Sequence, residues 1–534
     1  MSKAGPADQA DPDADPDGSD EVGGARPWRD RGPRQWLRPA TEAGRSFLDR
    51  PYASTQLMLL TGLCLLLVGV MMAASTTISA SLQQGSHQDI WSQLVKEIEF
   101  LVIGVPVFWL AVRMPPSAYR RLAYPMLGIG LFALMAVLVP GIGAVVNGAH
   151  RWIMFGPLGV QPSEFVKIAI LLWGGDLLTR KLHFGTLTSA RHLFVPLVPM
   201  FVLVCALVMI EPDLGTTLCF LLILLGLLWT VGTPFRYFAV IVAAIGAAVG
   251  ALAYFEPYRL ARLTSFTDPF KSSQHGGYQA VQGLYALASG GIFGVGLGNG
   301  TAKYNWLPNA NTDYVFAVVG EELGLIGCVV VLALFGLFAF TGMRISRRAD
   351  DPFIRLVGGG ATIWITGQAV INVGYVTGLL PVTGIPLPFI SDGGTSLLAT
   401  CLVFGMMVSF ARHDPAAVKA AQLSAQLGQR GRIERWARIA VPKTYVERKR
   451  PARPPATRPA ARPARAGASG TRAATQAATQ AAKAAASQRQ VPRPPQRQPA
   501  RPPQVARASA TGTSGSGPRL RPTGTESPRR RSTR

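Results

Sequence analysis

One carboxylate stands where a long polar stretch of the chain meets an apolar helix. Asp313 lies in the sequence NTDYVFAVVGEELG, at the start of a predicted membrane span. A carboxylate at the edge of a membrane is costly to keep and is typically functional. Asp313 could act as a general base that activates a sugar hydroxyl at the membrane surface. It could equally cap the helix that follows, because acidic residues favour helix N-termini.

Basic residues accompany Asp313 in the predicted outer loops. They are Arg151, Arg259, Arg262, Lys271 and Lys303. Ordinary solvated charge is one interpretation. The other is a clamp for a phosphate-bearing head group, for which arginine and lysine are the usual choices.

Other residues near these loops also have candidate roles. Trp152 could anchor the chain in the interfacial aromatic belt. Glu211 and Asp213, in EPDLGTT, could be paired acids or could cap the next helix. Glu321 and Glu322 lie inside an apolar run, so we expect one of them to face the bundle interior and to pair with a basic residue.

The glycine run from Gly290 to Gly300, GGIFGVGLGNG, matches no complete nucleotide-binding pattern. It indicates tight re-entrant packing rather than a phosphate cradle. The five cysteines lie in apolar runs without metal-ligand spacing and are interpreted as packing residues. No metal-ligand constellation is visible, although a bound pyrophosphate could itself carry a divalent cation.

The elements that must position these residues are membrane helices. Hydrophobic residues make up 49% of the 534 residues, and mean hydropathy is +0.25. Apolar runs near 20 residues recur, as in transmembrane helices. We predict an all-α polytopic membrane protein with ten spans, and a large extracytoplasmic loop, 255–313, between the seventh and eighth. The predicted spans are 57–79, 94–112, 122–140, 164–179, 194–210, 215–231, 236–254, 314–341, 356–378 and 394–411.

Charge asymmetry predicts the orientation. Basic residues recur in every second connection, which places those connections and both termini in the cytoplasm. Residues 1–50 are polar and predicted to be disordered, and 51–412 form the membrane domain. The segment 413–534 is rich in Pro, Ala and Arg and is mostly disordered. From position 412 onward, 27 Lys and Arg stand against four Asp and Glu, so this tail is expected to attract anionic membrane lipid. Nucleic-acid binding is disfavoured, since no aromatic residue follows Tyr445.

Five segments together resemble the SEDS family of membrane glycosyltransferases, which includes FtsW, RodA and SpoVE. They are RWIMFGPLGVQPSEFVKIA, EPDLGTT, LTSFTDPF with GGYQAVQGLYALASGGIFGVGLGNG, KYNWLPNANTDYVFAVVGEELG, and INVGYVTGLLPVTGIPLPFISDGGTS. They occur in the family's order and span 50–412. The resemblance implies a multi-pass protein of the bacterial cytoplasmic membrane that polymerises peptidoglycan glycan strands from lipid II and releases undecaprenyl pyrophosphate.

The resemblance also implies roles for single residues. Asp313 matches the family's essential aspartate, a general base. Arg151, Trp152 and Lys303 match positions that line the cavity, and Glu321 matches the acid of GEELG. IPLPFISDGGTS and the long tails resemble the division-type branch, which would place the protein at the septum; an elongation-type polymerase and a lipid II flippase are the alternatives.

Three positions depart from the family pattern, and they bear on substrate contact. Asn311 stands where many members have His, Asp392 where Tyr, Ser or Ala is common, and Thr383 where many division-type members have Lys. If that lysine binds pyrophosphate in other family members, Arg259 or Lys303 would have to bind it in this chain. The family further implies a class B penicillin-binding transpeptidase as partner, and the tails could recruit division-complex proteins.

Overall fold

The computed structural model describes residues 46–83, 87–146, 149–156, 158–185, 187, 190–255, 270, 277–304, 306–391, 394–429 and 440–446. All of these belong to one compact unit, Met1–Ala452. The predicted disorder of 1–50 and of the tail beyond 447 lies almost entirely outside the described residues.

Each of the ten predicted spans coincides with a helix. The apolar runs form helices because no charge or turn residue interrupts their hydrophobic pattern for long enough to end them. In chain order the helices are α2 (Ala53–Gln83), α3 (His87–Arg113), α4 (Pro116–Val137), α5 (Pro162–Phe184), α7 (Leu197–Ile210), α8 (Leu214–Val231), α9 (Phe235–Phe255), α12 (Val315–Arg348), α13 (Pro352–Val376) and α14 (Thr395–Ala411).

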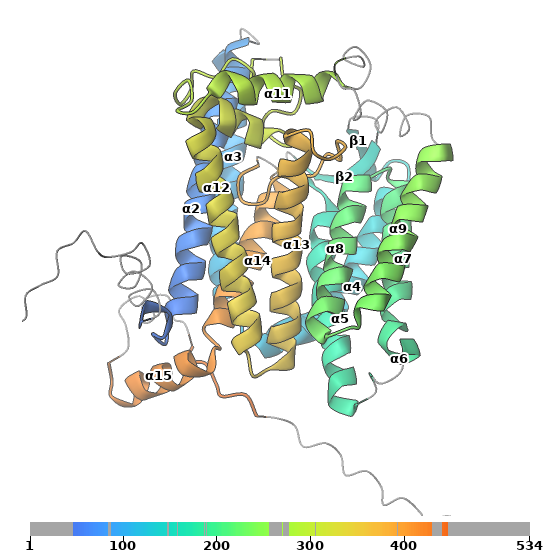
Figure 1. Cartoon of the computed structure of the whole chain (residues 1–534), viewed down its shortest axis with the longest axis vertical. Helices are drawn as coiled ribbons and strands as arrows, with labels where there is room; N and C mark the ends of the chain where they lie inside the picture. Colours follow the sequence, from blue (N-terminus) through green and yellow to red (C-terminus); the bar gives the residue numbers. More distant parts are fainter. Residues whose placement is uncertain are drawn as a thin grey trace, which may run out of the picture. The chain divides into compact units, whose positions relative to one another are not determined.

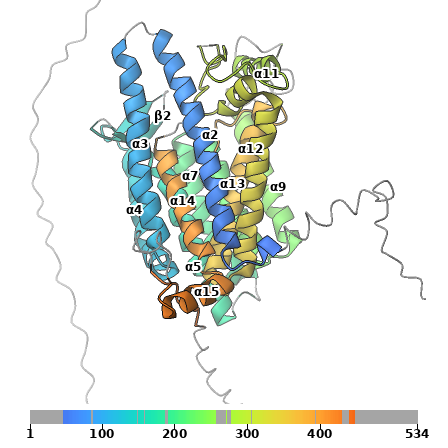
Figure 2. The ribbon, with the colours of Figure 1, turned by 90° about the vertical axis from the view of Figure 1, so that its left-hand side faces the viewer.

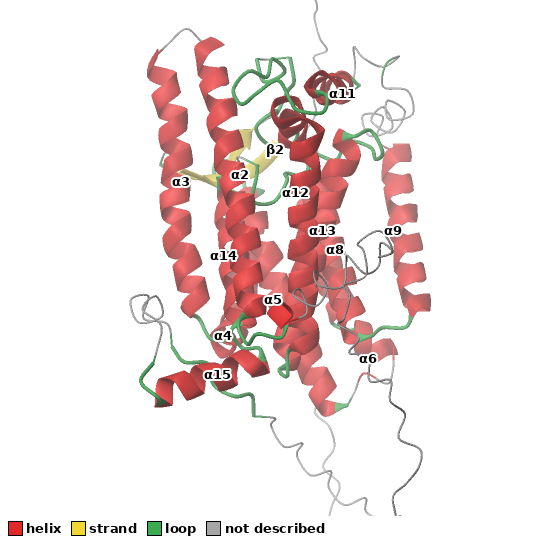
Figure 3. Cartoon of the chain, turned by 60° about the vertical axis from the view of Figure 1, so that its left-hand side comes forward, coloured by secondary structure: helices red, strands yellow, loops and turns green. Residues whose placement is uncertain are grey.

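Some of these helices qualify as membrane spans on length and apolar composition alone. Five described helices, α2, α4, α8, α12 and α13, are long and apolar enough to cross a membrane. A sixth span results if α14 is joined to α15 (Pro415–Gln426) across a bend of 73° (Figure 3). Helix α5 carries Glu164, Lys167 and Asp176 in its interior. The count of ten crossings therefore stays a prediction.

Helix α13 lies at the centre of the bundle, packed on α12, α8 and α5 (Figure 1). Of its apolar window, 67% is buried, against 22% for α4, which is peripheral. On the opposite side, α2 packs on α3 and α12 (Figure 2). Close approach depends on small residues: a Cβ at Gly226 of α8 would lie 3.1 Å from Gly360 Cα of α13.

A three-stranded antiparallel sheet occupies the loop 141–163, and the sequence did not predict it. Its strands are β1 (Gly143–Val146), β2 (Ala149–Phe155) and β3 (Leu158–Val160), in the order β1-β2-β3. Trp152 of β2 pairs with Ala144 of β1. Figure 1 shows β1 and β2 at the same end of the bundle as α11 (Tyr278–Gly290). The fold is thus predominantly helical rather than strictly all-α.

Helix α12 is broken at Gly324, and the glycine run packs into the break. Gly324 has φ +68° and ψ −167°, outside helical geometry. The carbonyls of Glu321 and Glu322 accept hydrogen bonds from the backbone of Val295 and Gly296, at 2.9 and 3.1 Å. A Cβ at Gly324 would meet the backbone nitrogen of Gly294 at 2.3 Å. The predicted tight packing of this run, which follows directly after α11, is confirmed.

Candidate active site

A cavity of about 270 Å³ brings together several of the residues that the sequence singled out. Asp313, Arg151 and Trp152 all line it. They come from the start of the α12 region and from β2, segments that are far apart in the chain. Further charged groups in its wall are Glu164, Lys167 and Asp213.

Two side chains of α13 fix the backbone of Asp313. The amide of Asn372 donates to the Asp313 carbonyl at 2.9 Å, and the Tyr375 hydroxyl lies 2.8 Å from the same oxygen. Both side chains also reach the Ile385 carbonyl at 2.7 Å. The Ser391 hydroxyl donates to the carbonyl of Thr312. Residue 313 is therefore joined to the segment 381–391 and held at a fixed place against α13.

The helix that follows Asp313 begins one residue later than a cap at Asp313 would require. The N-cap of α12 is Tyr314, which makes no side-chain cap hydrogen bond. The hydrogen bonds to its backbone carbonyl fix the position of residue 313. Space beside it is kept by Gly384, whose φ of +69° favours glycine, and a Cβ there would lie 3.5 Å from Asp313 Oδ2.

The EPDL turn holds Arg151. Its Nε donates to the Glu211 carbonyl at 3.0 Å and its Nη2 to the Pro212 carbonyl at 2.7 Å. Its Nη1 lies 4.0 Å from Asp213 Oδ2. Asp213 in turn caps α8, since its carboxylate accepts from the Thr216 backbone at 3.0 Å and from the Thr216 hydroxyl at 2.8 Å. The capping interpretation of this motif is confirmed for Asp213.

Glu211 behaves differently from Asp213, two residues away. Its side chain is buried, and neither carboxylate oxygen has a hydrogen-bond partner among the described residues. Burial first, and then the neighbouring Asp213 charge, raise the pKa of Glu211 to about 8, against the lowering influence of Arg151. The raised pKa favours the protonated form of the Glu211 carboxyl at neutral pH.

A buried ion pair in the cavity wall was missed by the sequence analysis. Lys167 Nζ lies 2.8 Å from Glu164 Oε1, and both side chains are buried. The ammonium also sits 5.4 Å from the centre of the Trp364 ring. The signal was present in QPSEFVK: an acid and a lysine three residues apart share one face of a helix. Lys167 supplies a second cation to the cavity beside Arg151.

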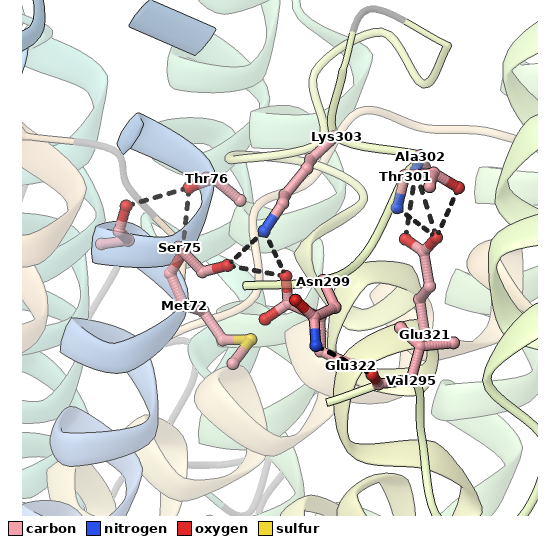
Figure 4. A network of polar contacts seen from close by, with 11 residues as sticks. Met72, Ser75, Thr76, Val295, Asn299, Thr301, Ala302, Lys303, Glu321 and Glu322 are labelled. Atoms are coloured by element: carbon pink, nitrogen blue, oxygen red, sulfur yellow. Dashed lines mark hydrogen bonds and ion pairs between the residues drawn. The ribbon is translucent and has the colours of Figure 1, made fainter. Parts of the chain in front are cut away.

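Lys303 is not among the residues that line this cavity; it belongs to a separate buried network (Figure 4). Its Nζ lies 2.6 Å from Glu322 Oε1 and 2.8 Å from Ser75 Oγ of α2. The Ser75 hydroxyl also donates to Glu322, at 2.6 Å. The prediction that Glu321 or Glu322 pairs with a basic residue is confirmed for Glu322. The cavity lining does not include Lys303, whose charge is paired inside the bundle, so a substrate contact by Lys303 stays a prediction.

Glu321 belongs to the same region and also lies apart from the cavity. Its carboxylate accepts from the backbone of Thr301 at 2.7 Å and of Ala302 at 3.1 Å (Figure 4). Glu321 thus holds the segment at Thr301 and Ala302 on α12. A direct substrate contact for Glu321 gains no support from this placement.

Arg259, Arg262, Lys271 and Asp392 lie outside the described residues. Thr383 lies in the segment that faces the cavity, and its backbone oxygen would be 2.9 Å from a Cβ at Gly215. In the described part of the chain, no three His, Cys, Asp or Glu side chains are grouped to hold a metal ion.

The helices and the cavity define a class: a multi-pass helical membrane protein with a charged site at one end of its bundle. Residues 55–415 match the family model described as "Cell cycle protein", which covers FtsW, RodA and SpoVE. The chain belongs to this family.

Known relatives and one solved structure agree with this assignment. The "Probable peptidoglycan glycosyltransferase FtsW" of Mycobacterium tuberculosis is 41% identical over 77% of this chain and 76% of its own length. The protein of the same name from Legionella pneumophila is 36% identical over 64% of this chain and 87% of its own. A chain from a structure titled "Structural coordination of polymerization and crosslinking by a peptidoglycan synthase complex" is 26% identical, with a TM-score of 0.54, over 66% of this chain and 97% of that one.

Proposed function

We propose that this protein polymerises lipid II into peptidoglycan glycan strands at the outer face of the cytoplasmic membrane during cell division. One observation carries the proposal: Asp313 shares a cavity with Arg151 and Lys167 in a chain whose relatives bear the name peptidoglycan glycosyltransferase. A fixed carboxylate beside two cations suits a reaction in which a hydroxyl loses a proton and a pyrophosphate leaves.

In the proposed reaction, Asp313 accepts the proton of the acceptor sugar's 4-hydroxyl as its oxygen attacks the donor's anomeric carbon. The bond from that carbon to the pyrophosphate breaks, and undecaprenyl pyrophosphate departs with the bonding electrons. The backbone clamp from Asn372 and Tyr375 lets the carboxylate meet the hydroxyl without reorganisation.

The cations of the cavity are assigned to the leaving group. Two nitrogens of Arg151 are used on backbone carbonyls, so Nη1 is the one that can turn to a phosphate oxygen. Lys167 supports it from α5. Trp152 offers its ring as a wall for a sugar. Arg259, Arg262 and Lys271 remain proposed phosphate contacts on the strength of the resemblance alone, and a divalent cation carried by the pyrophosphate remains open.

The test of this function is polymerisation of lipid II by the purified protein. Glycan strands, separated by gel electrophoresis, are the expected product, and their yield is expected to rise with a class B penicillin-binding transpeptidase. A protein that moves lipid II across vesicle membranes but forms no strand would instead be a flippase.

The cellular role follows from the same proposal. The relatives' name supports a septal rather than an elongation role. Both termini are proposed to lie in the cytoplasm, with the basic tail contacting membrane lipid and division-complex proteins. Removing residues from about 450 onward should spare polymerisation and weaken septal recruitment, which fluorescence microscopy of the tagged protein would measure.

A further inference from the structure

A second cavity, of about 830 Å³, lies at the far end of α5 from the Asp313 site. Its wall includes Arg120 and Arg121 of α4, Arg180 of α5 and Asp351 before α13. Glu164 lines the first cavity and Arg180 the second, so the two sites are about 24 Å apart along this one helix. The proposed function uses nothing in this second cavity.

A buried carboxylate organises the arginines of this cavity. Asp176 is 2% exposed, and its two oxygens lie 3.1 Å from Arg120 Nε and 2.8 Å from Arg180 Nε. Arg120 Nη1 also lies 3.8 Å from Asp351 Oδ1. Asp176 contacts Arg180 through Nε alone. Within the described residues, the terminal nitrogens of Arg180 therefore remain able to bind a ligand. An arginine held in this way is suited to a phosphate.

Aromatic rings fix the same guanidinium groups. Arg180 lies 5.2 Å from the ring centre of Tyr124, and Arg120 lies 5.1 Å from that of Phe353. Arg121 is exposed, and within the described residues it makes no ion pair. The wall therefore carries one more arginine than aspartate, which gives it a net positive charge.

Apolar side chains also line the cavity. Phe184 is 63% exposed and Tyr124 is 42% exposed, and Leu182 is a third apolar residue of the lining. A small hydrophilic anion would gain nothing from these side chains. A ligand with a phosphate and an attached hydrocarbon chain would satisfy both the arginines and the apolar surface.

Charge also excludes the chain's own tail as the occupant. Tyr445 and Val446 complete the wall of the cavity, and Gln422 of α15 bonds the Thr444 hydroxyl at 3.1 Å. The sequence that follows Val446 is strongly basic and does not complement a basic cavity. The positive-inside rule places these arginines in the cytoplasm, beside the leaflet whose anionic lipids bind basic pockets between helices.

We propose that this cavity binds the head group of an anionic glycerophospholipid from the cytoplasmic leaflet. Arg121 and Arg180 contact the phosphate, and Tyr124, Leu182 and Phe184 contact the start of the acyl chains. The ligand would thereby tie α4, α5 and the segment ending at Val446 to the membrane surface.

The test uses the full-length protein, purified in detergent and stripped of lipid, with phosphatidylglycerol as the probe. Native mass spectrometry measures retained lipid. The wild type should keep one phosphatidylglycerol in preference to phosphatidylcholine. Arg121→Gln and Arg180→Gln should each weaken this binding about tenfold, as expected for one lost charge-assisted contact. Arg236→Gln, which removes an exposed arginine outside the cavity, is the matched control and should bind as the wild type does.

Several results would overturn the proposal. Wild-type binding without preference for the anionic lipid would do so, and so would equal binding by the wild type and the two cavity variants. Displacement of the lipid by glycerol 3-phosphate or inorganic phosphate would mean that the site takes a soluble phosphate. Arg121→Lys should retain most binding, and a melting temperature equal to the wild type's would show that Arg121→Gln has not failed to fold.

Discussion

Replacing Lys303 by methionine tests whether this residue belongs to the bundle or to the substrate. The side chain of Lys303 is 1% exposed and that of Glu322 is 0% exposed, with Nζ and Oε1 2.6 Å apart. Methionine removes the ammonium and leaves the Glu322 carboxylate with the hydrogen bond from the Ser75 hydroxyl. Breaking a buried ion pair from one side costs about 3–5 kcal/mol. We expect Lys303→Met to lower the free energy of unfolding by that amount.

The double variant Lys303→Met/Glu322→Gln provides the second half of the test. Since it removes both charges, no uncompensated carboxylate is left in the bundle. It should be more stable than Lys303→Met alone, so the two substitutions should not be additive. Ser75→Ala is the matched control, because it deletes the hydroxyl's hydrogen bonds to Glu322 and Lys303 and keeps the ion pair. Its cost should be about 1–2 kcal/mol, less than that of breaking the pair.

The measurement is unfolding in mixed micelles, followed by near-ultraviolet circular dichroism over a titration with denaturing detergent. The reasoning fails if Lys303→Met unfolds at the wild-type midpoint while the KM for lipid II rises and kcat is unchanged. That pattern would mean that the substitution removed substrate binding. Lys303 would then be the phosphate contact that the family resemblance implied.

Three further predictions concern the cavity. Tyr375→Phe loosens the clamp on the Asp313 carbonyl, and lipid II polymerisation should slow about tenfold in a steady-state assay, while the loss of stability should stay near about 1 kcal/mol. The pKa of Glu211 is about 8 in the folded state against 4.5 in the unfolded state. Its contribution to the free energy of unfolding is therefore complete below about pH 4.5 and is lost as pH rises through 8. The melting temperatures at pH 6 and pH 9 should differ less for Glu211→Gln than for the wild type. Gly384→Ala places a Cβ 3.5 Å from Asp313 Oδ2 at a φ of +69°, so kcat should fall, whereas an unchanged kcat would show that this space is not needed.

Hydrophobic periodicity was sufficient to place the ten helices, because each apolar run is long and bounded by charge or turn residues. It was not sufficient for the sheet: AHRWIMF forms β2 through pairing with β1 and β3, and such pairing depends on strands that are weak signals singly. The break at Gly324 was also not foreseen. It depends on the glycine run, which approaches the break and forms backbone hydrogen bonds with the groups that the broken helix leaves unpaired.

The site was predicted where residue type and loop position agree. Arg151, Trp152 and Asp313 were each chosen from a predicted outer loop, and they share one cavity. Lys303 satisfied the same criteria, yet it pairs with Glu322, since sequence position cannot tell which way a side chain turns. Lys167 was overlooked because it lies inside an apolar span, where its buried pairing with Glu164 depends on the helix repeat.

The central claim is that the Asp313 carboxylate is the general base of glycan polymerisation. Its most direct test is the rate of strand formation from lipid II by purified Asp313→Asn, compared with Asp213→Asn, the same substitution in the same cavity. General-base catalysis contributes about 10²–10⁴-fold to a rate. The rate of the Asp313 variant should therefore fall by at least about 10²-fold, while its melting temperature stays at the wild-type value. Asp213→Asn should lose far less, since asparagine caps a helix about as well as aspartate. Polymerisation by Asp313→Asn at near the wild-type rate would contradict the assignment of the base.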